Sequence, residues 1–375
     1  MRILHVVGSM KREGIQTWLM HVLRRVDPVD YHMDFLVHTS EEAAYDKEIR
    51  DAGSLIIPCP WNHRYPPQYA SDFRRAVREY GPYDILHSHL DYYSGVVLWL
   101  ADSVGSEKLI AHSHNDARVI EQGARVTTRA FVNLNKWMIS RYAICGLAAS
   151  RKAAEFLFGL EWEHDPRWRL LFCGIDLDPF KQAVDNHKIR AELGIPAKAF
   201  VVGHVGRFYE QKNHTFLIDI AGEVAKTGAD IRFLLVGDGP LRRAIEQKVE
   251  RMGLQENVIF AGVRENIPSL MLGAMDAFIL PSLHEGLPLT LMEAQAAGLP
   301  CIYSDVISDE ADIVNYLVHR LPVEGPADIW AAEILKLWRM KPTAKNAEAI
   351  AIVENSAFNI ASSVEELIRI YEGLC

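Results

Sequence analysis

Residues 281–300 read P-S-L-H-E-G-L-P-L-T-L-M-E-A-Q-A-A-G-L-P, and this stretch predicts a loop followed by a helix. The apolar residues 277–280 before it predict a buried strand that runs into the loop. Pro288 suits the first turn of a helix, which we therefore expect to begin near Leu287. A buried strand that leads directly into a helix is typical of parallel α/β sheets.

The same stretch gathers polar groups around an expected anion site. The free amides of Leu287, Leu289 and Thr290, together with the positive end of the helix dipole, suit a phosphate group. Glu285 precedes the helix, and Glu293 lies about two turns inside it. Carboxylates do not bind phosphate, so we interpret both as acceptors for ribose or hexose hydroxyls. The pattern therefore indicates a sugar nucleotide, although an isolated E-x7-E is also compatible with a solvated loop and helix face.

Short apolar segments alternate with helical stretches along the chain, which is the pattern of parallel sheets covered by helices on both faces. We expect two series of strands, at 3–7, 35–37, 55–57, 85–87, 109–111, 146–149 and 170–172, and at 200–205, 233–236, 258–261, 278–280 and 301–303. The fold class is therefore α/β with two doubly wound halves. In such sheets the loops that follow the strands bind ligands.

Residues 284–300 resemble the signature of retaining glycosyltransferases of family 4, and the resemblance continues along nearly the whole chain. It implies the GT-B fold, in which two Rossmann-like domains face each other across a cleft. It further implies an acceptor-side domain at 1–180, a nucleotide-sugar domain at 181–352, and a helix within 353–375 that crosses back to the first domain. Among family members, bacterial capsule and exopolysaccharide transferases are the most similar.

The second half opens with V-G-R-F-Y-E-Q-K-N-H, which puts an arginine and a lysine into one loop after a strand. Such a pair of cations would neutralise a diphosphate leaving group, although a charged surface loop has the same composition. The segment resembles the family's G-R-x-x-x-x-K motif, whose arginine and lysine bind the donor pyrophosphate. The resemblance carries these roles to Arg207 and Lys212.

Two other loops resemble donor-side segments of the family. The loop G-S-M-K-R-E-G-I-Q-T resembles its first glycine-rich loop, but Glu13 stands where members commonly have a second glycine, so only Gly14 carries over. An ordinary turn explains that loop equally well. Residues 261–267, which include Arg264, resemble the segment whose backbone meets the nucleobase. Gly286 belongs to the expected donor site through the signature itself.

Four histidines follow two expected strands, in D-I-L-H-S-H and A-H-S-H-N. Their spacing does not fix three ligands on one ion, so we expect no metal. Family members usually carry a histidine here that contacts the reacting sugar. Its distance from the end of the expected strand matches His114 best, and His112 is the second candidate. His89 resembles an acceptor-side position, and His87 is interpreted as structural.

Composition limits the other classes of function. The formal net charge of −9 argues against a nucleic-acid partner. The five cysteines show no metal-ligand spacing, and no apolar run is long enough for a membrane helix, so we expect a cytoplasmic protein. Basic and aromatic residues mix between 118 and 141. A solvated basic helix face explains this pattern more often than a membrane contact does, and peripheral association with the inner face of the plasma membrane is the alternative.

The resemblance implies a retaining, metal-independent enzyme with no cofactor. It would move a hexose or N-acetylhexosamine from a nucleotide-diphosphate sugar, UDP being favoured, to a glycan or lipid-linked acceptor. We expect Arg207, Lys212, Glu285 and His114 to act in catalysis, because the cations stabilise the leaving diphosphate and the other two orient the hexose. Alternatives are a non-hydrolysing nucleotide-sugar epimerase and a non-catalytic nucleotide-sugar-binding protein. A dinucleotide oxidoreductase is disfavoured, because no G-x-G-x-x-G opens a helix after a strand.

Overall fold

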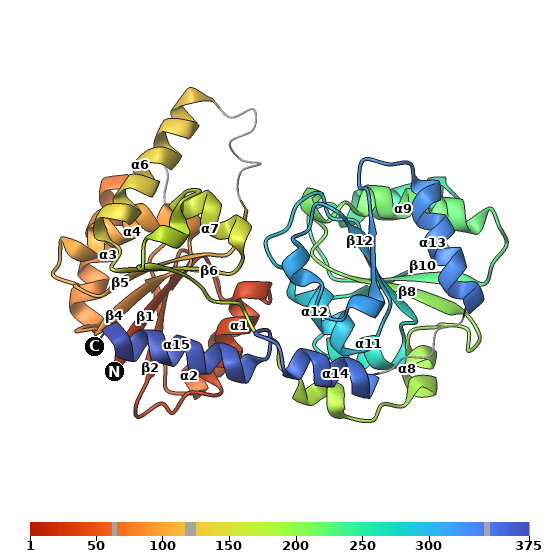
Figure 1. Cartoon of the computed structure of the whole chain (residues 1–375), viewed down its shortest axis with the longest axis horizontal. Helices are drawn as coiled ribbons and strands as arrows, with labels where there is room; N and C mark the ends of the chain where they lie inside the picture. The colour runs from red at the N-terminus through yellow and green to blue at the C-terminus, as the bar shows by residue number, and fades with distance from the viewer. Residues whose placement is uncertain (62–65, 117–124, 341–345, 375) are drawn as a thin grey trace. The chain divides into compact units, whose positions relative to one another are not determined.

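The computed structural model describes residues 1–61, 66–116, 125–340 and 346–374. Contacts within the chain divide it into two compact units (Figure 1). Unit 1 contains Met1–Gly174 together with Ile360–Cys375, and unit 2 contains Ile175–Asn359. The domain boundaries expected after residues 180 and 352 stay predictions.

Unit 1 is a seven-stranded parallel sheet with the order β3-β2-β1-β4-β5-β6-β7. Helices α1 and α15 cover one face, and α3, α4 and α7 cover the other (Figure 1). Because both faces are covered, the central strands are apolar along most of their length. The strands are β1 (Arg2–Val7), β2 (His32–Val37), β3 (Ile56–Pro58), β4 (Ile85–Ser88), β5 (Leu109–Ser113), β6 (Cys145–Ala148) and β7 (Trp168–Leu170). The helices are α1 (Gly14–Leu23), α2 (Asp46–Asp51), α3 (Pro66–Tyr80), α4 (Ser94–Asp102), α6 (Val126–Tyr142), α7 (Arg151–Phe158) and α15 (Ile360–Leu374), with 3-10 turns η1 (Asp91–Tyr93) and η2 (Trp162–His164).

Unit 2 repeats this plan in a six-stranded parallel sheet with the order β10-β9-β8-β11-β12-β13. In each sheet the strand order reverses beside the first strand, between β1 and β4 and between β8 and β11. Such reversals are where open α/β sheets bind ligands. The strands are β8 (Phe200–Val205), β9 (Ile231–Val236), β10 (Val258–Gly262), β11 (Ala277–Leu280), β12 (Cys301–Ser304) and β13 (Val318–Leu321). The helices are α8 (Asn186–Glu192), α9 (His214–Ala225), α10 (Arg242–Arg251), α11 (Ile267–Gly273), α12 (Leu289–Ala296), α13 (Ala327–Met340) and α14 (Asn346–Glu354), with 3-10 turns η3 (Asp178–Lys181), η4 (Glu210–Lys212), η5 (Asp309–Ala311) and η6 (Asn315–Leu317).

Helix α12 begins later than the sequence analysis expected. Pro288 is its N-cap and is extended, with φ −75° and ψ 105°, and the first helical residue is Leu289. The expected start near Leu287 was wrong, because a residue that precedes proline is sterically kept out of the helical region. The proline still ends the loop and fixes where the helix starts.

Strand β13 was missed by the sequence analysis. Its sequence, V-H-R-L, alternates apolar and polar residues, and all four side chains are only partly buried at the sheet edge. The apolar-run criterion detects central strands, which are buried on both faces, and fails for such an edge strand.

Helix α15 packs on unit 1 through a buried stripe and two polar ties. Its buried face includes Val364 and Leu367. The Trp18 indole nitrogen donates to Ser363 Oγ at 3.0 Å, and Ser363 Oγ donates to the Phe172 carbonyl at 2.8 Å. These bonds hold the last helix of the chain against the segment that follows β7.

Candidate active site

The loops that follow β8 and β11 are tied together in unit 2. Strands β8 and β11 are neighbours in the sheet, so their loops leave the same edge. The Leu283 amide donates to the Gln211 carbonyl at 2.9 Å. The Gln211 side chain donates to the His284 carbonyl at 3.0 Å and to Glu285 Oε2 at 3.3 Å. These bonds fix the distance between the two loops, and sequence reasoning gave Gln211 no role.

Lys212 and Glu285 form an ion pair across these loops. The Lys212 Nζ lies 2.6 Å from Glu285 Oε1, with side-chain exposures of 18% and 7%. Lys212 ends η4, and the next residue, Asn213, takes the left-handed conformation with φ 53° as it caps α9. The sequence predicted both residues for one site, and the structure brings them into contact. Because an ammonium group has three donors, Lys212 keeps capacity for a second anionic partner.

Arg207 lies in the same loop but is exposed. Its guanidinium carbon stands 4.2 Å from the centroid of the Tyr209 ring. A cation on an aromatic face is held without losing its hydrogen-bond donors. Arg207 and Lys212 thus supply two positive charges from one loop, one exposed and one largely buried.

Close backbone packing orders this loop. The Gly206 amide donates to the Val236 carbonyl at 3.0 Å, and Gly237 adopts φ 132°. A Cβ atom at position 237 would stand 2.1 Å from the Gly206 carbonyl oxygen. Only glycine fits there, so Gly237 allows the loop after β9 to support the loop that carries Arg207.

The N-terminus of α12 follows Glu285, Gly286 and Leu287 closely in the chain, with Pro288 as its N-cap. The amides of Leu289 and Thr290 are in its first turn, where a helix has no carbonyl of its own to bond them. Thr290 Oγ1 is buried and has no hydrogen-bond partner in the described part of the chain. Gly286 is buried and Leu287 is half-buried. This end of α12 therefore offers donors of the kind that bind an anion.

Glu293 lies on the second turn of α12 and is partly buried. Burial raises the pKa of Glu293 from its ordinary value of 4.5 to about 7. Glu285, by contrast, has the Lys212 ammonium group beside it. The two glutamates of the signature are therefore held in electrostatically different environments.

Arg264 in unit 2 and Gly14 in unit 1 are both exposed. The Arg264 Nε donates to the Ala261 carbonyl of its own loop at 2.9 Å. Gly14 is the first residue of α1 in unit 1, and Glu13 is the N-cap of that helix. Their roles in donor binding stay predictions.

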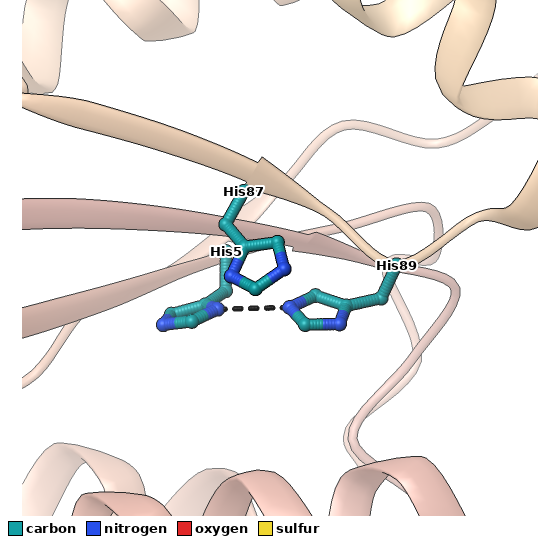
Figure 2. Close-up of side chains that lie close together, drawn as sticks. All are labelled: His5, His87 and His89. Carbon is teal, nitrogen blue, oxygen red and sulfur yellow. Dashed lines mark hydrogen bonds between the residues drawn. The ribbon is translucent and has the colours of Figure 1, made fainter. Parts of the chain in front are cut away.

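In unit 1 the predicted histidines lie together with one more, His5. All five are buried, on β1 and at the ends of β4 and β5. His5 Nδ1 is 2.9 Å from His89 Nε2 (Figure 2), and His89 Nδ1 is 3.0 Å from His114 Nε2. His87 Nε2 is 3.2 Å from His112 Nδ1. The sequence predicted four of these histidines as separate residues that face a sugar or support the structure. It did not predict His5, the fifth member, because no motif marks this strand residue.

Each ring nitrogen of His114 has a protein partner. The Nε2 atom meets His89, and Nδ1 lies 3.7 Å from Cys173 Sγ. Burial lowers the pKa of His114 to about 3, so its imidazole is neutral at pH 7. A sugar hydroxyl that binds His114 would have to replace one of these partners.

Asp91 holds the backbone at His114. Its carboxylate accepts from the His114 amide at 2.7 Å and from the Asn115 amide at 3.3 Å. The Asp91 backbone has a positive φ of 47°, which aspartate adopts more readily than most residues. Burial raises the pKa of Asp91, and these hydrogen bonds oppose that shift. The sequence did not predict a role for Asp91, because its side chain acts by accepting a hydrogen bond from a backbone amide that is distant in the sequence.

The basic stretch expected at 118–141 is described only in part, since residues 117–124 lie outside the described structure. Helix α6 extends away from the sheet (Figure 1) and exposes Val126, Leu134 and Trp137, by 81%, 52% and 58%. Arg129 and Arg141 on the same helix are exposed. No helix in the described ranges has the length and apolar character that crossing a membrane requires.

Two doubly wound parallel sheets define the GT-B class. The Anabaena HepE structure in complex with UDP-glucose aligns with all of this chain and all of its own, with a TM-score of 0.82 and 19% identity. That alignment confirms the predicted fold class.

Sequence comparison identifies the family. Residues 185–352 match the glycosyl transferases group 1 family, and residues 13–166 match the glycosyl transferase 4-like domain. The putative glycosyltransferase EpsF of Bacillus subtilis is 36% identical over 339 residues, which are 89% of this chain and 87% of that protein. An Escherichia coli UDP-Gal:alpha-D-GlcNAc-diphosphoundecaprenol alpha-1,3-galactosyltransferase is 35% identical over 146 residues, 38% of each chain. The chain belongs to the group 1 glycosyltransferases and is an enzyme of that family.

Proposed function

We propose that this glycosyltransferase is metal-independent, retains the anomeric configuration, and moves a hexose or N-acetylhexosamine from a UDP-sugar to a glycan or lipid-linked acceptor. The reaction would serve the synthesis of a capsule or exopolysaccharide. The observation that carries the proposal is the Lys212–Glu285 pair beside the α12 N-terminus, at the strand-order reversal of unit 2. It combines a cation for phosphate with a carboxylate for sugar hydroxyls.

Charge is the basis of the proposed chemistry. When the bond between the sugar and the diphosphate breaks, its electron pair passes to the leaving phosphate oxygen, so negative charge grows there. Arg207, Lys212 and the first-turn amides of Leu289 and Thr290 are fixed positive groups that stabilise this charge. Because these groups are already in place, no carboxylate-held ion is needed to bridge the diphosphate. Retention follows from the family resemblance alone.

The donor sugar would be oriented by carboxylates and histidine. Glu293 would accept hydrogen bonds from ribose hydroxyls, and Glu285 with His114 would contact the hexose. The loop that contains Arg264 would meet the base. UDP is favoured because the E. coli relative is named for UDP-Gal and the Anabaena structure is described as a complex with UDP-glucose.

The acceptor would bind to unit 1, with His89 and His112 on that side. The E. coli relative is named for an acceptor linked to diphosphoundecaprenol, which supports a lipid-linked acceptor here. The apolar and basic residues of α6, including Trp137 and Arg141, would hold the protein at the inner face of an anionic membrane. The protein would thus be cytoplasmic and peripherally attached.

A transfer assay tests this function. The protein is incubated with a panel of UDP-, GDP- and ADP-sugars and with diphosphoundecaprenol-linked sugars of one to three residues, and products are separated by mass. We expect one UDP-sugar to extend one acceptor, with the anomeric configuration of the donor kept in the product by NMR. A sugar epimerised without acceptor, or binding without turnover across the panel, would contradict the proposal.

A further inference from the structure

Four side chains of unit 1 form a continuous row of hydrogen-bonding atoms, which we call the histidine row. It runs from Cys173 through His114 and His89 to His5. The successive separations are 3.7 Å from Cys173 Sγ to His114 Nδ1, 3.0 Å from His114 Nε2 to His89 Nδ1, and 2.9 Å from His89 Nε2 to His5 Nδ1. His5 lies on β1 with no exposed surface, so it cannot touch a substrate.

Every member of the row is neutral at physiological pH. Burial lowers the pKa of His5 and of His114 to about 3, and it lowers the pKa of His89 well below its usual value. Burial also raises the pKa of the Cys173 thiol, which stays protonated. A neutral imidazole has one N–H and one lone pair, so each bond of the row has a donor and an acceptor. Fixing the proton on one ring therefore fixes it on the next.

The two ends of the row decide the direction in which its protons point. His5 Nε2 is buried and has no hydrogen-bond partner among the described residues. If His5 carries its proton on Nδ1, the Nε2 atom is an acceptor without a donor. If His5 carries its proton on Nε2, that atom is a buried N–H group without an acceptor. Buried N–H groups without a partner are rarer than buried acceptors without one. The favoured direction therefore has His5 Nδ1–H donating to His89, His89 Nδ1–H donating to His114, and His114 Nδ1–H pointing to Cys173.

We infer that His5 is a positioning residue that sets the tautomer of His89 and, through it, of His114. This inference rests on the proposed contact between His114 and the donor sugar. In the favoured direction His114 presents an N–H on Nδ1. A sugar oxygen that replaces Cys173 there accepts this proton, while the bond from His89 to His114 Nε2 stays in place. His5 thereby determines which hydrogen bond the site offers, from a position that the substrate never reaches.

A bound transition metal is the competing explanation for clustered histidines. One nitrogen each of His5, His87 and His89 lie within 4.8 Å of one another (Figure 2), and imidazole suits zinc, copper and nickel. However, both ring nitrogens of His89 already meet other rings, and both nitrogens of His87 meet Tyr371 or His112. A metal ion would have to replace these hydrogen bonds. The observed contacts therefore favour the hydrogen-bonded histidine row over a metal site.

The test compares two variants of His5. In His5→Asn the side-chain amide nitrogen takes the place of Nδ1–H, whereas His5→Leu keeps the bulk and removes the donor. We expect His5→Leu to lower kcat about tenfold, the value of one hydrogen bond, with little change in the KM of the donor. His5→Asn should restore most of that loss. His38→Leu is the matched control, because it removes another histidine of unit 1, bonded to Tyr69 and outside the row.

Nitrogen-15 NMR of the histidine rings gives a readout that is independent of activity. We expect Nδ1–H tautomers for His5, His89 and His114 in the wild type and in His5→Asn, and a mixture for His89 and His114 in His5→Leu. Nε2–H tautomers in the wild type, or unchanged tautomers and kcat in His5→Leu, would overturn the inference. Stoichiometric zinc, copper or nickel by elemental analysis, lost in His5→Leu, would also overturn it. If no sugar were transferred by any form, the tautomers would still decide whether the row exists.

Discussion

Replacing Glu293 by glutamine should stabilise the protein while weakening its binding of nucleotide. Burial raises the pKa of Glu293 from 4.5 to about 7, so the folded protein bears a cost for ionising it. Because a tenfold change in a proton-binding constant corresponds to about 1.4 kcal/mol, the largest cost is about 3.5 kcal/mol. Because the folded pKa lies above the unfolded one, this cost is absent below about pH 4.5, grows with pH, and is complete above about pH 7. Glutamine is neutral throughout and avoids it.

Urea unfolding at pH 5 and pH 8 measures this effect. We expect Glu293→Gln to be more stable than wild type by less than about 1 kcal/mol at pH 5 and by about 3 kcal/mol at pH 8. Glu256→Gln, at an exposed position of the same unit, is the matched control and should show no such dependence. The affinity for UDP should fall in Glu293→Gln at pH 8, because glutamine accepts fewer hydrogen bonds from ribose. A stability difference that does not change with pH would contradict the raised pKa of Glu293. Unchanged affinity for UDP would contradict its role in binding ribose.

Three further predictions concern metal, the His114 loop and the membrane. Transfer should survive exhaustive chelation and dialysis; activity that disappears and returns with magnesium, manganese or zinc would contradict the electrostatic mechanism. Asp91→Ala should lower kcat about tenfold and reduce the melting temperature, whereas Asp91→Asn, which can still accept from the His114 amide, should lose less; equal kinetics in both variants would exclude a positioning role. Trp137→Ser should leave UDP binding intact but reduce co-sedimentation with vesicles that contain anionic phospholipid. Unchanged co-sedimentation would contradict the proposed contact between α6 and the membrane.

The central strands and the class of fold could be predicted because they depend on local patterns. Strands β8 and β11 are apolar along most of their length, and their sheet is confirmed as parallel and doubly wound. The edge strand β13 could not be found, because half of its residues are polar. The start of α12 was placed too early, because Pro288 was assigned to the first turn when it is the N-cap.

The candidate site was predictable where a motif carries side-chain chemistry. Lys212 and Glu285 were both named, and they are in contact. Three other residues gave no signal, since each acts through a tertiary contact. Gln211 joins two loops, Asp91 accepts from a backbone amide far along the chain, and His5 reads as an ordinary strand residue. Spacing along the sequence cannot express such contacts.

Calorimetric titration of UDP, in the presence of chelator, tests whether the loop after β8 binds the donor diphosphate. Arg207→Ala is the cleaner variant, because Arg207 is exposed and its loss should not unfold the protein. Lys212→Ala leaves the buried Glu285 without its partner, so its fold must first be verified by circular dichroism. Lys226→Ala, at an exposed lysine of the same unit, is the control. We expect Arg207→Ala and Lys212→Ala each to bind UDP at least about tenfold more weakly than wild type, and Lys226→Ala to bind it normally. Wild-type affinity in both site variants would contradict this role of the loop.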